Sequence, residues 1–180
     1  MQHFDVLIVG AGISGIGSAC HLQSKCPDKT FAILEARAEY GGTWDLFRYP
    51  GIRSDSDMHT LGFSFKPWVA SKSIADGPSI KKYLQETIAE HELSEHIQYR
   101  TKVLSANWSS KDSSWILEIT ADESTSSLSC NFLMMCSGYY NYEKPFKPEF
   151  LSESVFEGQV IHTQLWPENL DYENKKIIVI

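Results

Sequence analysis

The sequence has few of the features that mark metal-binding, disulfide-rich or membrane proteins. Its cysteines form no CxxC pair and no Cys/His spacing suited to zinc; they are Cys20, Cys26, Cys130 and Cys136. No apolar run approaches the ~18 residues that a membrane span needs. No charged leader precedes the first apolar segment. We therefore expect a cytoplasmic protein with reduced thiols, no metal site and no transmembrane segment.

Positive charge is also scarce. The 180 residues contain 16 Lys and Arg against 23 Asp and Glu, which gives a formal net charge of -7. This balance lacks the basic footprint of a nucleic-acid-binding protein, so we expect no nucleic-acid partner. The hydrophobic content of 42% and charged content of 22% are typical of a globular protein. Backbone N–H groups and a few local cations would therefore have to hold any anionic ligand.

The N-terminal residues show a strand–helix–strand pattern. Residues 4–9 form a short apolar run that stops at Gly10, which is typical of a buried parallel strand. From Ile13 the apolar positions follow a helical period that ends near Pro27. Residues 31–34 are a second apolar run, which ends at Glu35. This order predicts an α/β fold with a Rossmann-type dinucleotide-binding domain.

The later segments extend this domain. After Pro78 the sequence predicts a helix with one face made of Ile80, Tyr83, Leu84, Thr87, Ile88 and, as a boundary residue, His91. Residues 97–103, 115–120 and 128–136 are predicted strands separated by polar turns. A three-stranded antiparallel meander inserted after a βαβ unit favours an FAD-type domain over a plain NAD domain. Residues 36–68 are expected to form an ordered loop, the usual place for ligand contacts.

The glycines after the first predicted strand can hold a dinucleotide. Gly10 allows a tight turn, Gly12 allows a pyrophosphate to approach the backbone, and Gly15 allows close helix–strand packing. The helix N-terminus adds N–H donors and a partial positive charge. Glu35 stands 20 positions after the last glycine, where it can accept hydrogen bonds from ribose hydroxyls and repel the 2′-phosphate of NADP. The alternative is a packing turn with a surface Glu, which the strand–turn–helix context disfavours.

Two longer motifs identify a family. Residues 41–55 follow the pattern G-G-x-W, four residues, Y-P-G, three residues and D, while residues 156–167 follow F-x-G-x-x-x-H-x-x-x-W-P. With these motifs the chain resembles the type I Baeyer–Villiger flavin monooxygenases over essentially its whole length. About the first 70 residues, and residues 136–142, are especially similar to the ethionamide-activating branch of that family.

The resemblance implies a role for each matching residue. The expected ligands of the FAD pyrophosphate are Gly10, Gly12, Ser14 and Gly15, with Glu35 on the adenosine ribose. The expected flavin-side residues are Gly42, Thr43, Trp44, Asp45 and Leu46. Val103 would contact adenine through its backbone, and Arg53 and Ser54 would lie in the NADP channel. Asp55 is the candidate catalytic residue, which would orient an arginine located after residue 180.

The resemblance also implies an activity and a domain plan. The expected enzyme uses FAD, NADPH and dioxygen to convert a ketone into an ester or lactone through a flavin C4a-peroxide. Oxidation of a thioether or thioamide is a possible side activity. Residues 1–142 would form the FAD-binding domain, residues 143–174 a linker, and residues 175–180 the first strand of an NADP-binding domain that continues further on. Such a fragment alone is expected to be inactive.

Three alternative functions are weighed against this one. An N-hydroxylating or sulfoxidising flavin monooxygenase shares the FAD turn, but its linker motif usually ends in Tyr-Lys rather than Trp166 and Pro167. A disulfide reductase would need a cysteine pair after the Gly-Gly loop, where this chain has none. A non-catalytic, truncated FAD-binding module is the third. Within the linker motif, His162 is expected to be structural rather than an acid–base group.

Overall fold

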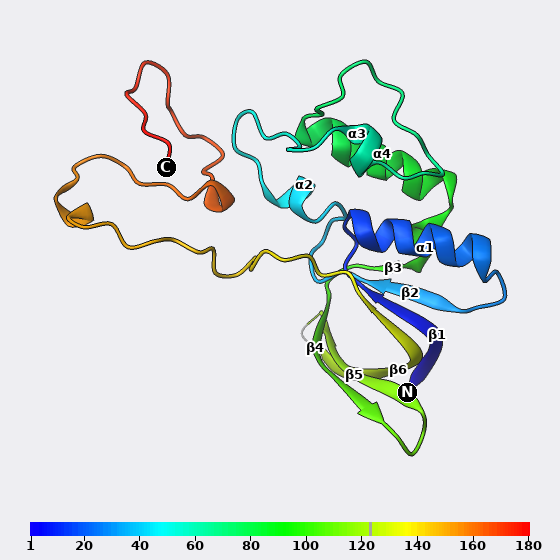
Figure 1. Cartoon of the computed structure of the whole chain (residues 1–180). Coiled ribbons are helices and arrows are strands. Elements are labelled where there is room, and N and C mark those ends of the chain that lie inside the picture. Colours follow the sequence, from blue (N-terminus) through cyan, green and yellow to red (C-terminus); the bar gives the residue numbers. More distant parts are fainter. Residues whose placement is uncertain (123) are drawn as a thin grey trace.

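The computed structural model describes residues 1–122 and 124–180 and is built around one six-stranded mixed sheet (Figure 1). The strands are β1 (Gln2–Val9), β2 (Phe31–Leu34), β3 (Ile97–Gln98), β4 (Thr101–Ser109), β5 (Ser114–Ala121) and β6 (Ser124–Met135). The α-helices are α1 (Ile13–Lys25), α2 (Thr43–Leu46), α3 (Met58–Leu61) and α4 (Gly77–Glu90). Short 3-10 helices are η1 (Leu93–His96), η2 (Glu153–Val155) and η3 (Thr163–Leu165).

The sheet has a parallel half and an antiparallel half. Its strand order is β3-β2-β1-β6-β5-β4, in which β1 pairs in parallel with β2 and with β6. Strands β4, β5 and β6 form an antiparallel meander. Both the Rossmann-type unit and the inserted meander predicted from the sequence are therefore confirmed.

Side chains of β1 alternate between two cores. Val6 and Ile8 point to the face that carries the helices, where they join a cluster with Ile16, Ile33 and Leu84. Leu7 points to the opposite face and belongs to a second cluster, with Ala32, Leu34, Leu117, Ile119, Leu128 and Cys130. Because the meander supplies much of this second cluster, the parallel strands are covered on both faces.

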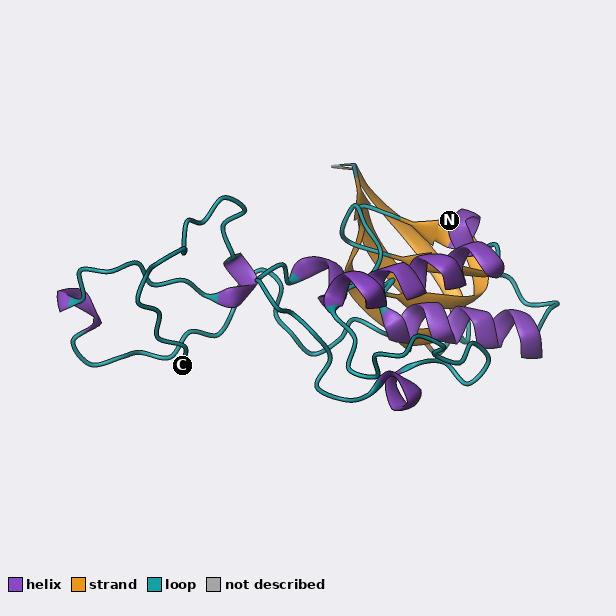
Figure 2. Cartoon of the chain, turned by 90° about the horizontal axis from the view of Figure 1, so that it is seen from above, coloured by secondary structure: helices purple, strands orange, loops and turns teal. Residues whose placement is uncertain are grey.

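Helix α4 lies beside α1 over the sheet (Figures 1 and 2). Its predicted face is confirmed, because Ile80, Tyr83, Leu84, Thr87 and Ile88 are buried and His91 is the half-buried C-cap residue. Asp76 caps the helix, with its carboxylate accepting a hydrogen bond from the Ser79 N–H at 2.8 Å. Among the described residues, no helix combines the length and apolar character needed to cross a bilayer.

Two predicted strands differ in the structure. The strand expected at 97–103 is interrupted because Arg100 adopts a positive φ of 53°, and its N–H donates to the Arg37 carbonyl at 3.0 Å. The chain thereby turns from β3, beside β2, to β4, beside β5. Residues 175–180, predicted as a strand, form none, since a strand needs a hydrogen-bonded neighbour and this segment lies away from the sheet (Figure 1).

Truncation of a fully buried residue of α4 should measurably weaken the fold. Leu84 is 0% exposed, so Leu84→Ala should lower the free energy of unfolding by about 2–5 kcal/mol. The cost of the lost apolar burial and the cost of the cavity left behind both contribute to this value. Urea denaturation provides the measurement. Leu104→Ala on β4, where the side chain is 49% exposed, is the control and should change it by about 0.5 kcal/mol. Equal losses in the two variants would contradict the packing described.

Candidate dinucleotide-binding site

The turn between β1 and α1 has no room for side chains at two of its glycines. Gly10 has a φ of +106°, and a Cβ there would lie 2.5 Å from the Cys136 carbonyl oxygen. A Cβ on Gly15 would lie 1.9 Å from the Gly10 carbonyl oxygen. At Gly12, by contrast, an added Cβ would meet only the Gly42 Cα, at 3.8 Å. The predicted tight turn, open to an approaching ligand at Gly12, is therefore present.

The N-terminus of α1 offers unfilled donors. Gly12 is its N-cap residue and has no side chain to accept from the first-turn N–H groups. Ser14 is exposed at the same end. Free N–H groups together with the helix dipole suit an anion such as a dinucleotide diphosphate.

The Glu35 side chain is hydrogen-bonded to this turn. Its side chain is buried, and its Oε2 accepts a hydrogen bond from the Ala11 N–H at 2.8 Å. Its Oε1 accepts from the Arg37 N–H, also at 2.8 Å. A carboxylate has about four lone-pair positions, so both oxygens can still accept from ribose hydroxyls. The predicted ribose ligand thus also holds the turn in place.

The Gly41–Gly42 loop packs on the first glycine turn. The Gly41 N–H donates to the Ala11 carbonyl at 2.9 Å, and a Cβ on Gly42 would lie 3.3 Å from the Gly12 Cα. Positive φ values of +110° and +54° at the two glycines make this approach possible. Helix α2 begins directly afterwards, which places the half-buried Thr43 and Trp44 beside the turn.

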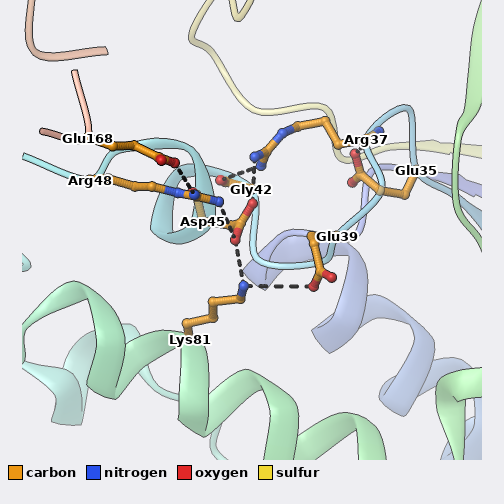
Figure 3. A network of polar contacts seen from close by, with 8 residues as sticks. All are labelled: Glu35, Arg37, Glu39, Gly42, Asp45, Arg48, Lys81 and Glu168. Carbon is orange, nitrogen blue, oxygen red and sulfur yellow. Dashed lines mark hydrogen bonds and ion pairs between the residues drawn. The ribbon is translucent and has the colours of Figure 1, made fainter. Parts of the chain in front are cut away.

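Asp45 has an environment that the sequence did not predict. Its side chain is 2% exposed and accepts hydrogen bonds from Arg37 Nη2 and Lys81 Nζ, each at 2.5 Å, with Arg48 Nη2 at 3.6 Å (Figure 3). Burial alone would raise the pKa of this carboxyl group, but the Lys81 ammonium and the Arg37 guanidinium lower it. The Asp45 side chain is therefore the centre of a cluster of ion pairs, and the expectation that Asp45 lies along the flavin stays a prediction.

A cavity of about 220 Å³ lies beyond α2. It brings together five of the predicted residues, namely Thr43, Trp44, Arg53, Ser54 and Asp55. The aromatic rings that also line it were missed by sequence reasoning; they are Phe47, Tyr49, Tyr139 and Tyr140. The hydrogen bond to Tyr139, with burial and the charge of Asp55, raises the pKa of Tyr140. The predicted nicotinamide side is thus a defined pocket with both charged and aromatic walls.

Ser54 leaves a buried hydroxyl unpaired. Among the described residues, its Oγ is the one buried side-chain oxygen or nitrogen without a hydrogen-bond partner. Such an atom is costly unless a ligand or water satisfies it. Because Ser54 lines the cavity, a polar group bound there would be able to satisfy this hydroxyl.

Leu46 and Val103, like the glycine-turn residues, Glu35, Gly42 and Asp45, do not line this cavity. Leu46 is half-buried in α2, where its N–H donates to the Gly42 carbonyl at 2.9 Å. Val103 packs against the second core cluster from β4, two residues after Thr101, whose N–H donates to the Glu35 carbonyl at 2.8 Å. Val103 therefore lies on the Glu35 side of the site, as its expected contact with adenine requires.

A larger hollow, of about 630 Å³, is lined by α1 together with Leu61, Phe63 and Met134. Of the predicted site residues it contains Ser14, and most of its lining is apolar. The smaller cavity beside α2 is lined by the charged side chains of Arg53 and Asp55 and by the hydroxyl-bearing Ser54. We therefore place the candidate site there and along the glycine turn.

The linker motif is attached to the segment after β6. The Nδ1 of His162 accepts a hydrogen bond from the Gln164 N–H at 3.1 Å, so its Nε2 carries the proton that is donated to the Phe146 carbonyl at 3.0 Å. The buried Gln164 amide donates to the carbonyls of Asn141 and Tyr142, at 2.8 and 3.1 Å. With both ring nitrogens engaged by the backbone, His162 has the structural environment expected for it.

Replacing Glu35 by its isosteric amide tests its double role. In Glu35→Gln an NH2 group must face one of the two N–H donors, so that donor loses its acceptor. We expect the free energy of unfolding to fall by about 1–3 kcal/mol even without cofactor, measured by chemical denaturation of the apoprotein. No loss in the apoprotein would show that these two hydrogen bonds do not hold the turn.

Comparison with known proteins places this site in a family. Residues 8–84 match the NAD(P)-binding Rossmann-like domain, and residues 72–180 match the flavin-binding monooxygenase-like family. The chain is 56% identical over 179 residues to the FAD-containing monooxygenase EthA of Mycolicibacterium smegmatis, covering 99% of this chain and 36% of that protein. It is 54% identical over 180 residues to the probable FAD-binding monooxygenase AlmA of an Acinetobacter species, with the same coverage.

Solved structures agree with these matches. A steroid monooxygenase bound to NADP superposes with a TM-score of 0.76 at 29% identity, covering 93% of this chain and 32% of that one. A cyclohexanone monooxygenase bound to epsilon-caprolactone gives a TM-score of 0.77 at 27% identity, covering 94% and 33%. The chain spans about a third of the length of all these proteins. The resemblance found in the sequence is confirmed, and the chain belongs to the flavin-binding monooxygenase-like family.

Proposed function

We propose that this protein is an FAD- and NADPH-dependent monooxygenase that oxidises ketones to esters or lactones with dioxygen. The observation that carries the proposal is the cavity beside the glycine turn, where Trp44, Asp55 and the unpaired Ser54 hydroxyl meet. The family match and the FAD-containing relatives support FAD, and the NADP-bound steroid monooxygenase supports NADPH.

The residues present fit FAD. The uncapped N-terminus of α1 and the open side of Gly12 would hold the diphosphate, and Glu35 would accept from the adenosine ribose. Gly42, Thr43 and Trp44 would lie along the flavin side. When bound, FAD supplies the redox chemistry by which electrons from NADPH activate dioxygen, while the protein binds, orients and excludes water.

Asp55 would act on charge rather than transfer a proton. Its side chain is exposed at the cavity, and within residues 1–122 and 124–180 it makes no ion pair. A free carboxylate there would hold an arginine cation beside the substrate. That cation would stabilise the negative charge that develops on the ketone oxygen. Arg53 would offer a positive charge to the NADPH phosphates, and Ser54 a hydroxyl to its polar groups.

Ketones are proposed as substrates because the superposing structures include a cyclohexanone monooxygenase and a steroid monooxygenase. A thioether or thioamide is a second substrate class for the same cavity. We place the FAD-binding domain at residues 1–142 and a linker at 143–174. In this proposal residues 175–180 begin an NADP-binding domain and pair as a strand only with the rest of that domain.

The proposal is tested on the full-length enzyme, with the proposed NADP-binding domain included. The FAD-loaded enzyme is reduced with NADPH without oxygen, and oxygen is then added with either cyclohexanone or a thioether. NADPH should bleach the flavin absorbance, and isotope-labelled dioxygen should place one oxygen atom in the lactone. Bleaching followed by sulfoxide formation without lactone would replace the proposal by that of a sulfoxidising monooxygenase. Failure of NADPH to bleach bound flavin would overturn the monooxygenase assignment.

In the full-length enzyme, Asp55→Ala should separate ketone oxidation from FAD retention. Loss of the carboxylate should lower ketone oxidation on the order of 10²-fold, because the cation that stabilises the developing charge loses its anchor. FAD content, measured by absorbance, should remain close to that of the wild-type protein. Asp28→Ala, in the exposed turn before β2, is the control and should change neither quantity. A loss of FAD equal to the loss of turnover would contradict this role.

A further inference from the structure

Both walls of the cavity are attached to helix α4. The first wall is α2, which carries Thr43 and Trp44. It is attached through the next residue, Asp45, whose Oδ1 accepts a hydrogen bond from Lys81 Nζ at 2.5 Å (Figure 3). Lys81 lies in the second turn of α4.

The second wall is the segment that ends in Asp55. Its Ser54 N–H donates to the Ala75 carbonyl, and the Gly77 N–H donates to the Ile52 carbonyl, each at 2.9 Å. These bonds surround an antiparallel bridge between Arg53 and Asp76, the residue that caps α4. The fit is close, because a Cβ on Gly77 would lie 3.0 Å from the Ile52 Cγ2. This wall is therefore held by backbone bonds at the start of the same helix.

Helix α4 is a rigid support for both attachments. Its inner side chains Ile80 and Leu84 are 0% exposed and pack in the core that covers the sheet. Lys81 follows Ile80 directly, so its backbone is fixed by that packing. A displacement of the Lys81 backbone relative to the core would therefore require the helix itself to move.

The attachment of α2 to α4 depends most on the buried Asp45 carboxylate. It is 2% exposed, whereas its partners Lys81 and Arg37 are 30% and 26% exposed. Arg37 also donates to the Gly42 carbonyl at 3.4 Å, so the same carboxylate fixes the glycine loop. A buried charge that loses a partner is left uncompensated, which makes the pairs matter more than an exposed ion pair would.

We propose that Asp45 and Lys81 are positioning residues that set the spacing between the flavin-side wall and the Asp55 wall of the cavity. Neither is a catalytic residue; they act through α2, the glycine loop and α4. This proposal rests on the proposed FAD site. It assigns to Lys81, which has no place in the sequence motifs, control over how tightly and in which environment the flavin is bound.

The test compares FAD binding in Lys81→Gln, Asp45→Asn and the double variant. FAD is titrated into the apoprotein, and the visible spectrum and reduction potential of the bound flavin are then recorded. Each single variant should raise the Kd of FAD about tenfold or more and change the flavin spectrum, because the walls lose their common support. The double variant should bind FAD no more weakly than Asp45→Asn, since the Lys81 contact that positions α2 already depends on the Asp45 carboxylate.

Lys82→Gln is the matched control on the same helix. Lys82 is 75% exposed, and among the described residues its one ion-pair partner is Glu86, at 3.9 Å, so its removal should leave the Kd and spectrum of FAD unchanged. If Asp45→Asn does not fold, Lys81→Gln still tests the proposal, because the Lys81 side chain is partly exposed and its replacement should leave the protein folded.

A purely structural role has a different signature. In that case the thermal midpoint of the apoprotein would fall while the Kd, spectrum and potential of bound flavin stayed those of the wild type, and the proposal would be overturned. Failure of the wild-type protein to bind FAD would instead overturn the proposed function. The two failures are therefore distinguishable.

Discussion

The close contact between Gly10 and Gly15 is the constraint on which the rest of the site depends. With 1.9 Å between the Gly10 oxygen and the place of a Cβ on Gly15, no other residue fits, and α1 must start directly above the end of β1. That position exposes the uncapped helix N-terminus and presents Ala11 to two partners. Glu35 accepts its N–H, and Gly41 donates to its carbonyl. The ribose side and the flavin side are thus both built onto one turn.

Charge is distributed unexpectedly around this turn. An acidic chain was expected to hold an anionic ligand by backbone groups and local cations, and cations do gather near the glycine loop. Arg37, Arg48 and Lys81, however, all contact the buried Asp45 carboxylate. They stabilise the position of the loop, so the diphosphate is left mainly to the N–H groups of α1. This division explains how a protein with a net charge of -7 can offer an anion site without a basic surface.

Local signals made much of the fold predictable. The short run Phe31–Leu34 is a strand with the predicted bounds because it is buried on both faces, and α4 buries the predicted face because its apolar spacing is helical. The glycine turn was predictable because close packing at Gly10 and Gly15 leaves no room for a side chain, while Gly12 leaves its side of the turn open. The break at Arg100 was not, since it depends on a hydrogen bond to the distant Arg37 carbonyl.

The site was predictable only where a motif spans consecutive residues. Residues 43, 44 and 53–55 do meet in one cavity, as the motif implied. Tyr139 and Tyr140 reach it from beyond β6, and Lys81 reaches Asp45 across 36 residues, so neither contact has a local signature. The cations around Asp45 were not predictable for the same reason, because they come from separate parts of the chain. Residues 175–180 have strand composition but no partner strand.

Hydrogen exchange of backbone amides, compared between the apoprotein and the FAD-loaded protein, tests the central claim most directly. The account predicts that FAD slows exchange at residues 12–15, where the donors of α1 are free, and at residues 42–46, with little change along β4 and β5 beyond Val103. Unchanged exchange at residues 12–15, together with protection elsewhere, would contradict the claim that this turn holds the cofactor.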